Sequence, residues 1–291
     1  MDRVLIIGCG YVGKRVAKLA MEKNASVVAM ARAAKSFEEL EKLGIQTVSG
    51  DLDYPPSLRN LPTKGALVFY FAPPPGGGLT DPRMRSFCTS VAPGDEPHKV
   101  VYMSTSGVYG DCGGSAVTEE TPPHPQTTRA KRRLDAEAFL LSWGNERNAP
   151  VVILRVAGIY GPGRLPIPHI ESGNPVLYEH EAPFTNRIHA DDLARVCIAA
   201  ADKGEAGDIF NVSDGESGTM THYFNAVADA FGLMRPPQVS MKEAREVMNP
   251  LILSYFSESR QMDNGKMREK LGIGLLYPTL GEGLKASRTP D

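Results

Sequence analysis

Several features that mark particular classes of protein are scarce or missing in this sequence. The 291 residues include four cysteines, none in C-x-x-C spacing, so neither a disulfide framework nor a zinc site is indicated. The longest apolar run, residues 66–72, has the length of a strand and not the ~20 residues of a membrane helix. The N-terminus lacks the basic region, long apolar stretch and cleavage site of a secretory signal. We therefore expect a cytoplasmic protein with reduced thiols, no bound metal and no membrane partner.

An excess of charge of one sign is missing as well. The chain has 32 Lys and Arg against 34 Asp and Glu, a formal net charge of -2. Proteins that bind nucleic acids normally carry a strong basic excess, so no nucleic-acid partner is expected. The composition, 42% hydrophobic and 23% charged, is that of an average globular protein. At about 100–200 residues per domain, the length predicts one large domain or two modest ones.

Short apolar runs alternate with amphipathic stretches through the first half of the chain. The runs are strand-sized and lack alternation, as in strands covered on both faces. The predicted strands are residues 4–7, 27–30, 45–48, 66–71, 100–103 and 151–156, and the predicted helices 12–20, 37–43, 84–91 and 128–143. This order implies right-handed crossovers and a parallel sheet with helices on both faces. We predict an α/β fold with a Rossmann-type, doubly wound parallel sheet.

The alternation of apolar runs and amphipathic stretches ends near residue 160. Residues 161–185 contain five prolines and three glycines and show no sustained period, which is typical of a functional loop such as a lid. Residues 186–203 return to a helical pattern, and 219–291 show helices with short strands. We predict a dinucleotide-binding domain at residues 1–160, with 186–213 returning to it. Residues 161–185 and 214–291 would form a smaller C-terminal substrate lobe.

The sequence Gly8-Cys9-Gly10-Tyr11-Val12-Gly13 fits the pattern G-x-G-x-x-G. It directly follows a predicted strand and opens a predicted helix, which is the context that a dinucleotide-binding turn requires. Gly8 allows the tight turn, Gly10 lets a pyrophosphate approach the backbone, and Gly13 lets the helix pack against the strand. The helix N-terminus, which includes Tyr11 and Val12, supplies free N–H donors. We expect these residues to bind a dinucleotide.

The end of the second predicted strand bears on the choice of cofactor. An acidic residue there would suit the ribose 2′-hydroxyl of NAD, whereas an arginine suits the 2′-phosphate of NADP. The chain has no acid at this point and places Arg32 there. NADP is therefore the preferred expectation. NAD stays open, because an arginine at a strand end is often only a solvated surface charge.

Five later segments resemble the extended short-chain dehydrogenase/reductases, the branch with NAD-dependent epimerases and dehydratases, and they occur in that superfamily's order. They are Gly50–Leu52, Phe71–Pro74, Val101–Gly110, Leu154–Gly163 and Arg187–Ala194. The resemblance implies that Asp51 and Leu52 lie near the adenine, Ala72 and Pro73 form the turn under the cofactor, and Ser104 lies at the cofactor. The superfamily's frequent dimers make a homodimer one expectation, although no interface helix can be singled out.

The chemistry of the superfamily is hydride transfer to or from nicotinamide, assisted by a Tyr-x-x-x-Lys pair and a Ser or Thr hydroxyl. The lysine lowers the pKa of the tyrosine until the phenol can act as a general base. Thr105 aligns with the hydroxyl, so it is expected to bind the substrate oxygen. If Lys131 is the catalytic lysine, Thr127 stands at the tyrosine position. The sequence therefore departs from the superfamily's pattern at its proton-transfer residue.

A second register, set by Ala136 and Glu137, would place Arg129 and Arg133 at the two positions instead. This register also lacks a tyrosine. These arginines could hold an anionic substrate or cofactor phosphate. The alternative is a solvated helix face in which Arg133 pairs with Glu137 and Lys131 with Asp135.

Five other candidates for proton transfer are expected to have structural or solvated roles. We expect Tyr109 and Tyr160 to be structural, Tyr178 and His180 to be solvated loop residues, and His189 to be a hydrogen-bonded packing residue.

Two functions from different classes remain open. One is an NAD(P)-dependent oxidoreductase, epimerase or dehydratase of atypical type that acts on a small polar carbonyl or nucleotide-sugar-like molecule. The other is a non-catalytic NAD(P)-binding sensor or regulator. The missing tyrosine favours the sensor, whereas the hydroxyls at residues 104–106 and the long loop favour the enzyme.

Overall fold

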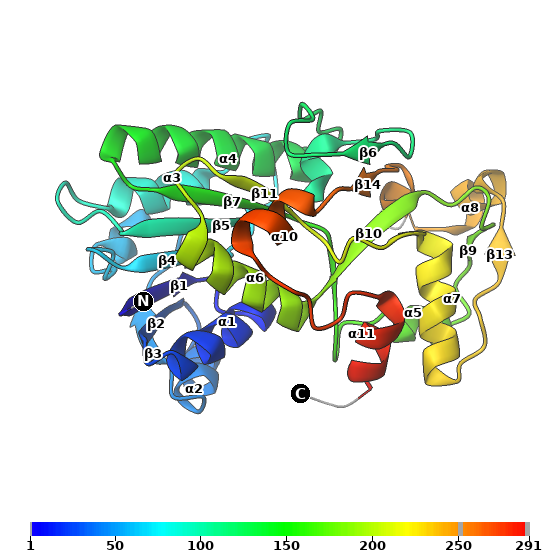
Figure 1. The fold of residues 1–291 in the computed structure, drawn as a ribbon, viewed down its shortest axis with the longest axis horizontal. Coiled ribbons are helices and arrows are strands. Elements are labelled where there is room, and N and C mark those ends of the chain that lie inside the picture. The colour runs from blue at the N-terminus through cyan, green and yellow to red at the C-terminus, as the bar shows by residue number, and fades with distance from the viewer. Residues whose placement is uncertain (1, 250–252, 289–291) are drawn as a thin grey trace.

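A seven-stranded parallel sheet organises the computed structural model, which describes residues 2–249 and 253–288 (Figure 1). Its strand order is β11-β7-β5-β4-β1-β2-β3, and all neighbouring strands run parallel. The strands are β1 Arg3–Ile7, β2 Ser26–Ala31, β3 Gln46–Ser49, β4 Leu67–Tyr70, β5 Lys99–Thr105, β7 Val151–Val156 and β11 Ile209–Val212. The predicted Rossmann-type sheet is confirmed.

Helices cover both faces of this sheet. On one face, α1 (Tyr11–Glu22), α2 (Ala34–Glu41) and α6 (Ala190–Lys203) pack on the side chains of Val4 and Ile6. On the other face, α3 (Pro82–Ser90), α4 (Thr128–Arg147) and the 3-10 helix η1 (Pro55–Leu58) pack on Leu5 and Ile7 (Figure 1). Successive residues of β1 therefore enter different cores, which explains why the strand is apolar without alternation.

The strand order reverses between β1 and β4. From β1 the chain proceeds outward to β2 and β3, and it then crosses back to β4, β5 and β7 on the other side. Ligands of doubly wound sheets bind in the crevice beyond the carboxyl ends of the strands at such a point. The glycine turn follows β1, and Thr105 ends β5, so both lie at this edge.

Smaller sheets and helices form a second region beside the carboxyl ends of the strands (Figure 1). A three-stranded sheet contains β8 (Gly158–Tyr160), β10 (Phe184–His189) and β12 (Ser217–Thr219). The two-stranded sheets pair β6 (Ala116–Val117) with β14 (Gln261–Met262) and β9 (Val176–Leu177) with β13 (Gln238–Val239). The helices are α5 Ile167–Glu171, α7 Met220–Phe231, α8 Met241–Val247, α10 Gly265–Leu271 and α11 Leu280–Ala286, with 3-10 helices η2 Ser106–Tyr109 and η3 Ser254–Phe256.

Two local predictions were wrong. The helix expected at 186–203 begins only at Ala190, because residues 187–189 pair with β8 as a strand. His189 then caps α6, since its ring nitrogen accepts from the N–H of Asp191. The segment 161–185, expected as a loop, contains α5 and β9, whose few residues are too short to show a period.

The division of the chain into two domains stays a prediction. Helix α10 belongs by sequence to the predicted substrate lobe, yet Met267 and Leu271 join the core on the α6 side of the large sheet. Within the described ranges, none of the helices combines the length and apolarity needed to cross a bilayer.

Candidate functional site

The glycine turn after β1 has the shape that a pyrophosphate requires. Gly8 has φ +92°, and a Cβ on it would lie 2.6 Å from the backbone nitrogen of Ala72. A Cβ on Gly13 would lie 3.0 Å from the carbonyl oxygen of Gly8, where α1 packs against the turn. By contrast, no atom lies within 4 Å of the place of a Cβ on Gly10. The turn is thus closely packed at Gly8 and Gly13 and open at Gly10, so it fits a dinucleotide phosphate.

A cleft of about 430 Å³ opens above this turn. No side chain caps the N-terminus of α1, so its first N–H groups point toward the cleft without an intrahelical partner. Burial raises the pKa of the Cys9 thiol to about 12, which keeps this side chain uncharged beside a phosphate. Of the predicted cofactor residues, the cleft is lined by Gly8, Gly10, Tyr11, Val12, Gly13, Arg32 and Pro73.

The other predicted cofactor residues lie beside the cleft or beneath it. Leu52 is buried in the core near η1, and the N–H of Ala72 donates to the carbonyl of Ile7 under the turn. Ser104 is buried, and its hydroxyl donates to the carboxylate of Glu137. Asp51 reaches Arg32 instead of lining the cleft.

Arg32 lies at the end of β2 with a side chain that is 64% exposed. Its guanidinium is 3.6 Å from a carboxylate oxygen of Asp51 and 3.6 Å from one of Asp53. Asp53 also binds Arg83 at 2.6 Å, and this hydrogen bond holds the pKa of the Asp53 carboxyl below its usual value. Two acids therefore orient Arg32 at the edge of the cleft, where a ribose 2′-substituent would compete for the guanidinium.

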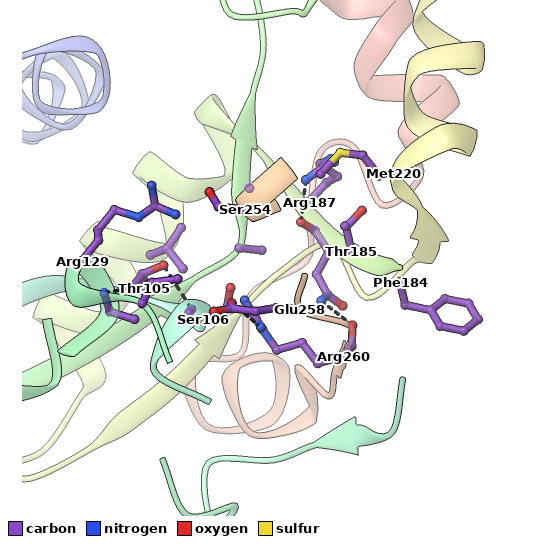
Figure 2. Close-up of a pocket in the computed structure, with 17 residues that line it drawn as sticks. Thr105, Ser106, Arg129, Phe184, Thr185, Arg187, Met220, Ser254, Glu258 and Arg260 are labelled. Carbon is purple, nitrogen blue, oxygen red and sulfur yellow. Dashed lines mark hydrogen bonds and ion pairs between the residues drawn. The ribbon is translucent and has the colours of Figure 1, made fainter. Parts of the chain in front are cut away.

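A second cavity, of about 180 Å³, lies at the end of β5 (Figure 2). Thr105 lines it, and its hydroxyl oxygen accepts from the N–H of Gly107 at 3.2 Å. Because the oxygen is held by this acceptor bond, the hydroxyl hydrogen remains available to a substrate oxygen. Polar and charged residues from three other parts of the chain line the same space: Thr127, Arg129, Thr185, Asn186, Arg187, Glu258 and Arg260.

The sequence left two arrangements open for helix α4: residues that bind ligand, or a solvated face with ion pairs along the helix. The structure matches neither in full. Thr127 caps the helix by accepting from the N–H of Ala130, and Arg129 lines the cavity with it. Lys131 is exposed and is not among the residues that line the cavity. Arg133 donates to the hydroxyl of Tyr102 at 3.1 Å and to the carbonyl of Met103 at 2.9 Å.

The predicted pairs along α4 were wrong, because its acids bind arginines of other elements. Asp135 binds Arg85 of α3 at 2.6 Å. Glu137 is 2% exposed and binds Arg155 of β7 at 2.9 Å. Tertiary partners that the local sequence does not contain therefore replace the expected i, i+4 contacts.

Arg187 of β10 lines this cavity with a side chain that is only partly satisfied. Its Nε is buried without a hydrogen-bond partner. The guanidinium contacts the carbonyl of Asn186 at 3.3 Å and the Sδ of Met220 at 3.0 Å, and it stacks on the ring of Tyr223 at 4.2 Å. No carboxylate of the described residues forms an ion pair with it, and burial lowers its pKa. An anionic ligand group would satisfy this cation.

A third cavity borders both spaces. It shares Ile159 and Arg164 with the glycine-turn cleft, and Gly158, Arg187 and Met220 with the Thr105 cavity. Tyr11 of α1 donates to the carbonyl of Pro162 at 2.8 Å, so the segment that carries Arg164 is tied to the turn. The three spaces therefore adjoin one another between the glycine turn and Thr105.

The remaining aromatic candidates take the roles expected of them. Tyr109 is buried and donates to Asn211 at 2.7 Å, and Tyr160 is buried in an apolar cluster. His189 is buried and hydrogen-bonded to the N–H of Asp191. Tyr178 and His180 are exposed and stack on each other.

Four lining residues escaped the sequence analysis as site residues: Arg164, Arg187, Glu258 and Arg260. Arg187 lies in a segment noted for its resemblance, but nothing there distinguished its side chain. The others follow no spacing that marks a site. The pairing of β10 with β8 and of β14 with β6 helps to bring the segments of Arg187, Glu258 and Arg260 to the end of β5.

Comparison with known proteins agrees with this geometry. Residues 86–213 match the model of the NAD dependent epimerase/dehydratase family, and residues 4–72 match that of the TrkA-N domain. A dTDP-D-glucose 4,6-dehydratase from Mus musculus is 31% identical over 126 residues, which are 39% of this chain and 34% of that protein. The matched segment thus spans about a third of the length of such curated relatives.

Solved structures resemble the chain over its whole length. A conserved protein of unknown function from Silicibacter pomeroyi has a TM-score of 0.82 and 26% identity, covering 99% of this chain and 98% of that one. MoeE5, solved with UDP-glucose and NAD, has a TM-score of 0.75 and 21% identity, covering 99% and 97%, and shows the fold alone. The family model matched over residues 86–213, together with the parallel sheet, supports a relationship to the extended short-chain dehydrogenase/reductase superfamily.

Proposed function

We propose that this protein is an NAD(P)-binding enzyme of the epimerase/dehydratase type that acts on a small polar carbonyl or nucleotide-sugar-like substrate. The observation that carries the proposal is the set of three adjoining cavities between the glycine turn and Thr105. It supports a dinucleotide and a substrate bound end to end, with the substrate oxygen at the Thr105 hydroxyl.

Different residues of the chain would bind different parts of the cofactor and the substrate. Gly8, Gly10 and Gly13, with the first N–H groups of α1, would hold the pyrophosphate. Arg32 would bind the 2′-phosphate of NADP, which is the preferred cofactor over NAD. When bound, the nicotinamide would supply or accept the hydride. On the substrate side, Thr105 would orient the reacting oxygen.

The unpaired guanidinium of Arg187 supports a substrate with an anionic group, such as the phosphate of a nucleotide sugar. Arginine is suited to such groups because its planar donors match phosphate and carboxylate oxygens. Lys131, proposed from the sequence as a catalytic residue, would need to turn toward the cavity to take part, because it is exposed on α4. Arg129, which lines the cavity, is the better supported residue of this helix turn.

The first test is a calorimetric titration with NADP, NADPH, NAD and NADH. We expect Arg32→Ala to weaken NADP(H) binding about tenfold or more, since charge-assisted hydrogen bonds contribute roughly 1.5–3 kcal/mol. Binding of NAD(H) should change little, and Arg59→Ala, on the exposed residue after η1, is the matched control. Equal losses for both cofactors would contradict the role of Arg32, and no binding of any of the four would overturn the proposed function.

Turnover then separates the enzyme from a sensor. Cofactor absorbance would be followed with UDP-glucose, dTDP-glucose and small ketones and aldehydes. We expect Thr105→Ala to lower kcat/KM by about a hundredfold while cofactor affinity is retained. Tight cofactor binding without turnover of any substrate would favour the second candidate, an NAD(P)-binding sensor, which the absence of the superfamily's tyrosine supports.

A further inference from the structure

The Thr105 cavity contains one group suited to proton transfer. Among the lining residues that the structure describes, Glu258 alone carries a side chain that can accept a proton at neutral pH. The remaining ionisable side chains of this lining are the arginines Arg129, Arg187 and Arg260, which stay protonated. Threonine and serine hydroxyls are too weakly acidic to replace a tyrosine whose pKa has been lowered.

The carboxylate of Glu258 is held at one oxygen and unsatisfied at the other. Its Oε2 binds the guanidinium of Arg260 at 2.9 Å, and the Glu258 side chain is 11% exposed. Its Oε1 is buried and has no hydrogen-bond partner. A buried carboxylate oxygen without a donor is costly, and such groups are expected where a ligand or a reaction uses them. Figure 2 shows Glu258 among the side chains that line the cavity, paired with Arg260.

We propose that Glu258 exchanges the proton with the substrate oxygen and so takes the place of the tyrosine that the chain lacks. The inference rests on the proposed function, because it assumes a nicotinamide cofactor in the adjoining cleft. In the oxidising direction, the substrate O–H bond breaks and its proton passes to Oε1 of Glu258. The neighbouring C–H bond breaks, its hydrogen leaves as hydride to the oxidised nicotinamide dinucleotide, and a C=O bond forms. Carbonyl reduction reverses each step, with Glu258 as the acid.

Several cations share the cavity with Glu258. Arg260 lies on its own segment, Arg129 lines the cavity from α4, and Arg187 lines it from β10. The negative charge of a Glu258 carboxylate would attract the positive ring of an oxidised nicotinamide more than the neutral ring of the reduced cofactor.

This difference gives a test that needs no substrate. The dissociation constants of NADP and NADPH would be measured by calorimetry at pH 7. If Glu258 lies near the nicotinamide, removing its charge in Glu258→Gln, whose shape is conserved, should weaken the binding of NADP relative to that of NADPH. We expect the ratio of the two affinities to change at least about fivefold, the lower end of typical coupling between sites.

Asp214→Asn is the matched control, because Asp214 is a buried acid of the cavity next to Arg187. The ratio of the NADP and NADPH affinities should be unchanged in this variant. An unchanged ratio in Glu258→Gln, or a change only in Asp214→Asn, would overturn the role of Glu258 and leave the proposed function standing. Binding of neither cofactor to the unmodified protein would overturn both.

For any substrate found in the turnover screen, Glu258→Gln should also lower kcat by about a hundredfold or more, with little change in cofactor affinity. Glu258→Asp should recover part of the rate and shift the pH profile, because it restores the carboxylate at a greater distance. An ion-pair role alone predicts instead that Glu258→Gln lowers the unfolding temperature and leaves the pH profile of kcat unchanged.

Discussion

Two glycines of the same turn are required for different reasons. Gly8 adopts a φ of +92° and faces the backbone of Ala72, so its lack of a side chain serves the fold. Gly10 has a negative φ of -88°, and the place of a Cβ on it faces open space. Its lack of a side chain serves only a ligand that approaches from the cleft. A pair of single substitutions can therefore separate folding from binding.

We expect Gly8→Ala to destabilise the protein by about 1–3 kcal/mol or more, because it adds backbone strain and a contact with Ala72. Gly10→Ala should leave the free energy of unfolding nearly unchanged but weaken dinucleotide binding at least tenfold, since the new methyl occupies the space of the pyrophosphate. Urea unfolding and calorimetric titration measure the two effects. Normal cofactor affinity in Gly10→Ala would show that no phosphate approaches this residue.

At the scale of elements, a buried polar network fastens α4 to the sheet. Glu137 of α4 binds Arg155 of β7 at 2.9 Å and accepts from Ser104 of β5. Arg155 also donates to the hydroxyl of Tyr109 at 3.1 Å. Burial alone would lower the pKa of Arg155, but its hydrogen bonds to Glu137 outweigh this and raise it. The network thus positions the end of β5, which carries Thr105.

We expect Glu137→Gln to destabilise the protein by about 3–5 kcal/mol, because it leaves the charge of Arg155 buried without a counter-ion. The control is Glu146→Gln, on an exposed residue of the same helix that accepts from Ser142. This change should stay within about 0.5 kcal/mol. Urea unfolding of both variants checks the difference, and equal effects would argue against a structural role for the buried pair.

At the scale of the whole molecule, the junction between the large sheet and the smaller elements is sensitive to pH. Asp214 follows β11, and its N–H donates to the carbonyl of Arg187 at 2.8 Å. Burial raises the pKa of the Asp214 carboxyl to about 7, and the charge of Glu216 contributes to the rise. The positive charge of Arg187 and the N–H of Glu216 oppose it. The folded state therefore binds a proton that the unfolded chain releases near pH 4.

Between about pH 4 and pH 7 the folded protein holds this proton and the unfolded chain does not, so the free energy of unfolding falls as the pH rises. Above pH 7 both states are ionised and this contribution becomes constant. The fall should reach roughly 4 kcal/mol for Asp214, taking about 1.4 kcal/mol for each pH unit between the two pKa values. Thermal unfolding of Asp214→Asn across this range should lack that fall. An unchanged pH dependence in the variant would contradict the raised pKa.

Much of the fold could be predicted because its causes are local. Val4 to Ile7 form an apolar strand, the glycines after them require a tight turn, and Val12, Val16 and Ala20 place one apolar stripe on α1. Such patterns repeat within a few residues, so they can be recognised without knowing what packs against them. The boundary between β10 and α6 was wrong because the pairing of residues 187–189 with β8 overrides the helical pattern.

The sequence by itself determined the parallel sheet, the glycine turn after its first strand and the position of Thr105 at a strand end. Only the tertiary structure decided that Lys131 faces outward, that Ser104 and Glu137 belong to a buried network, and that Arg187 and Glu258 meet Thr105 around one cavity. The physical reason is that turns and strands follow from steric and hydrophobic preferences of neighbouring residues. A site joins side chains from distant segments, and strand pairing and burial choose their partners only when the chain has folded.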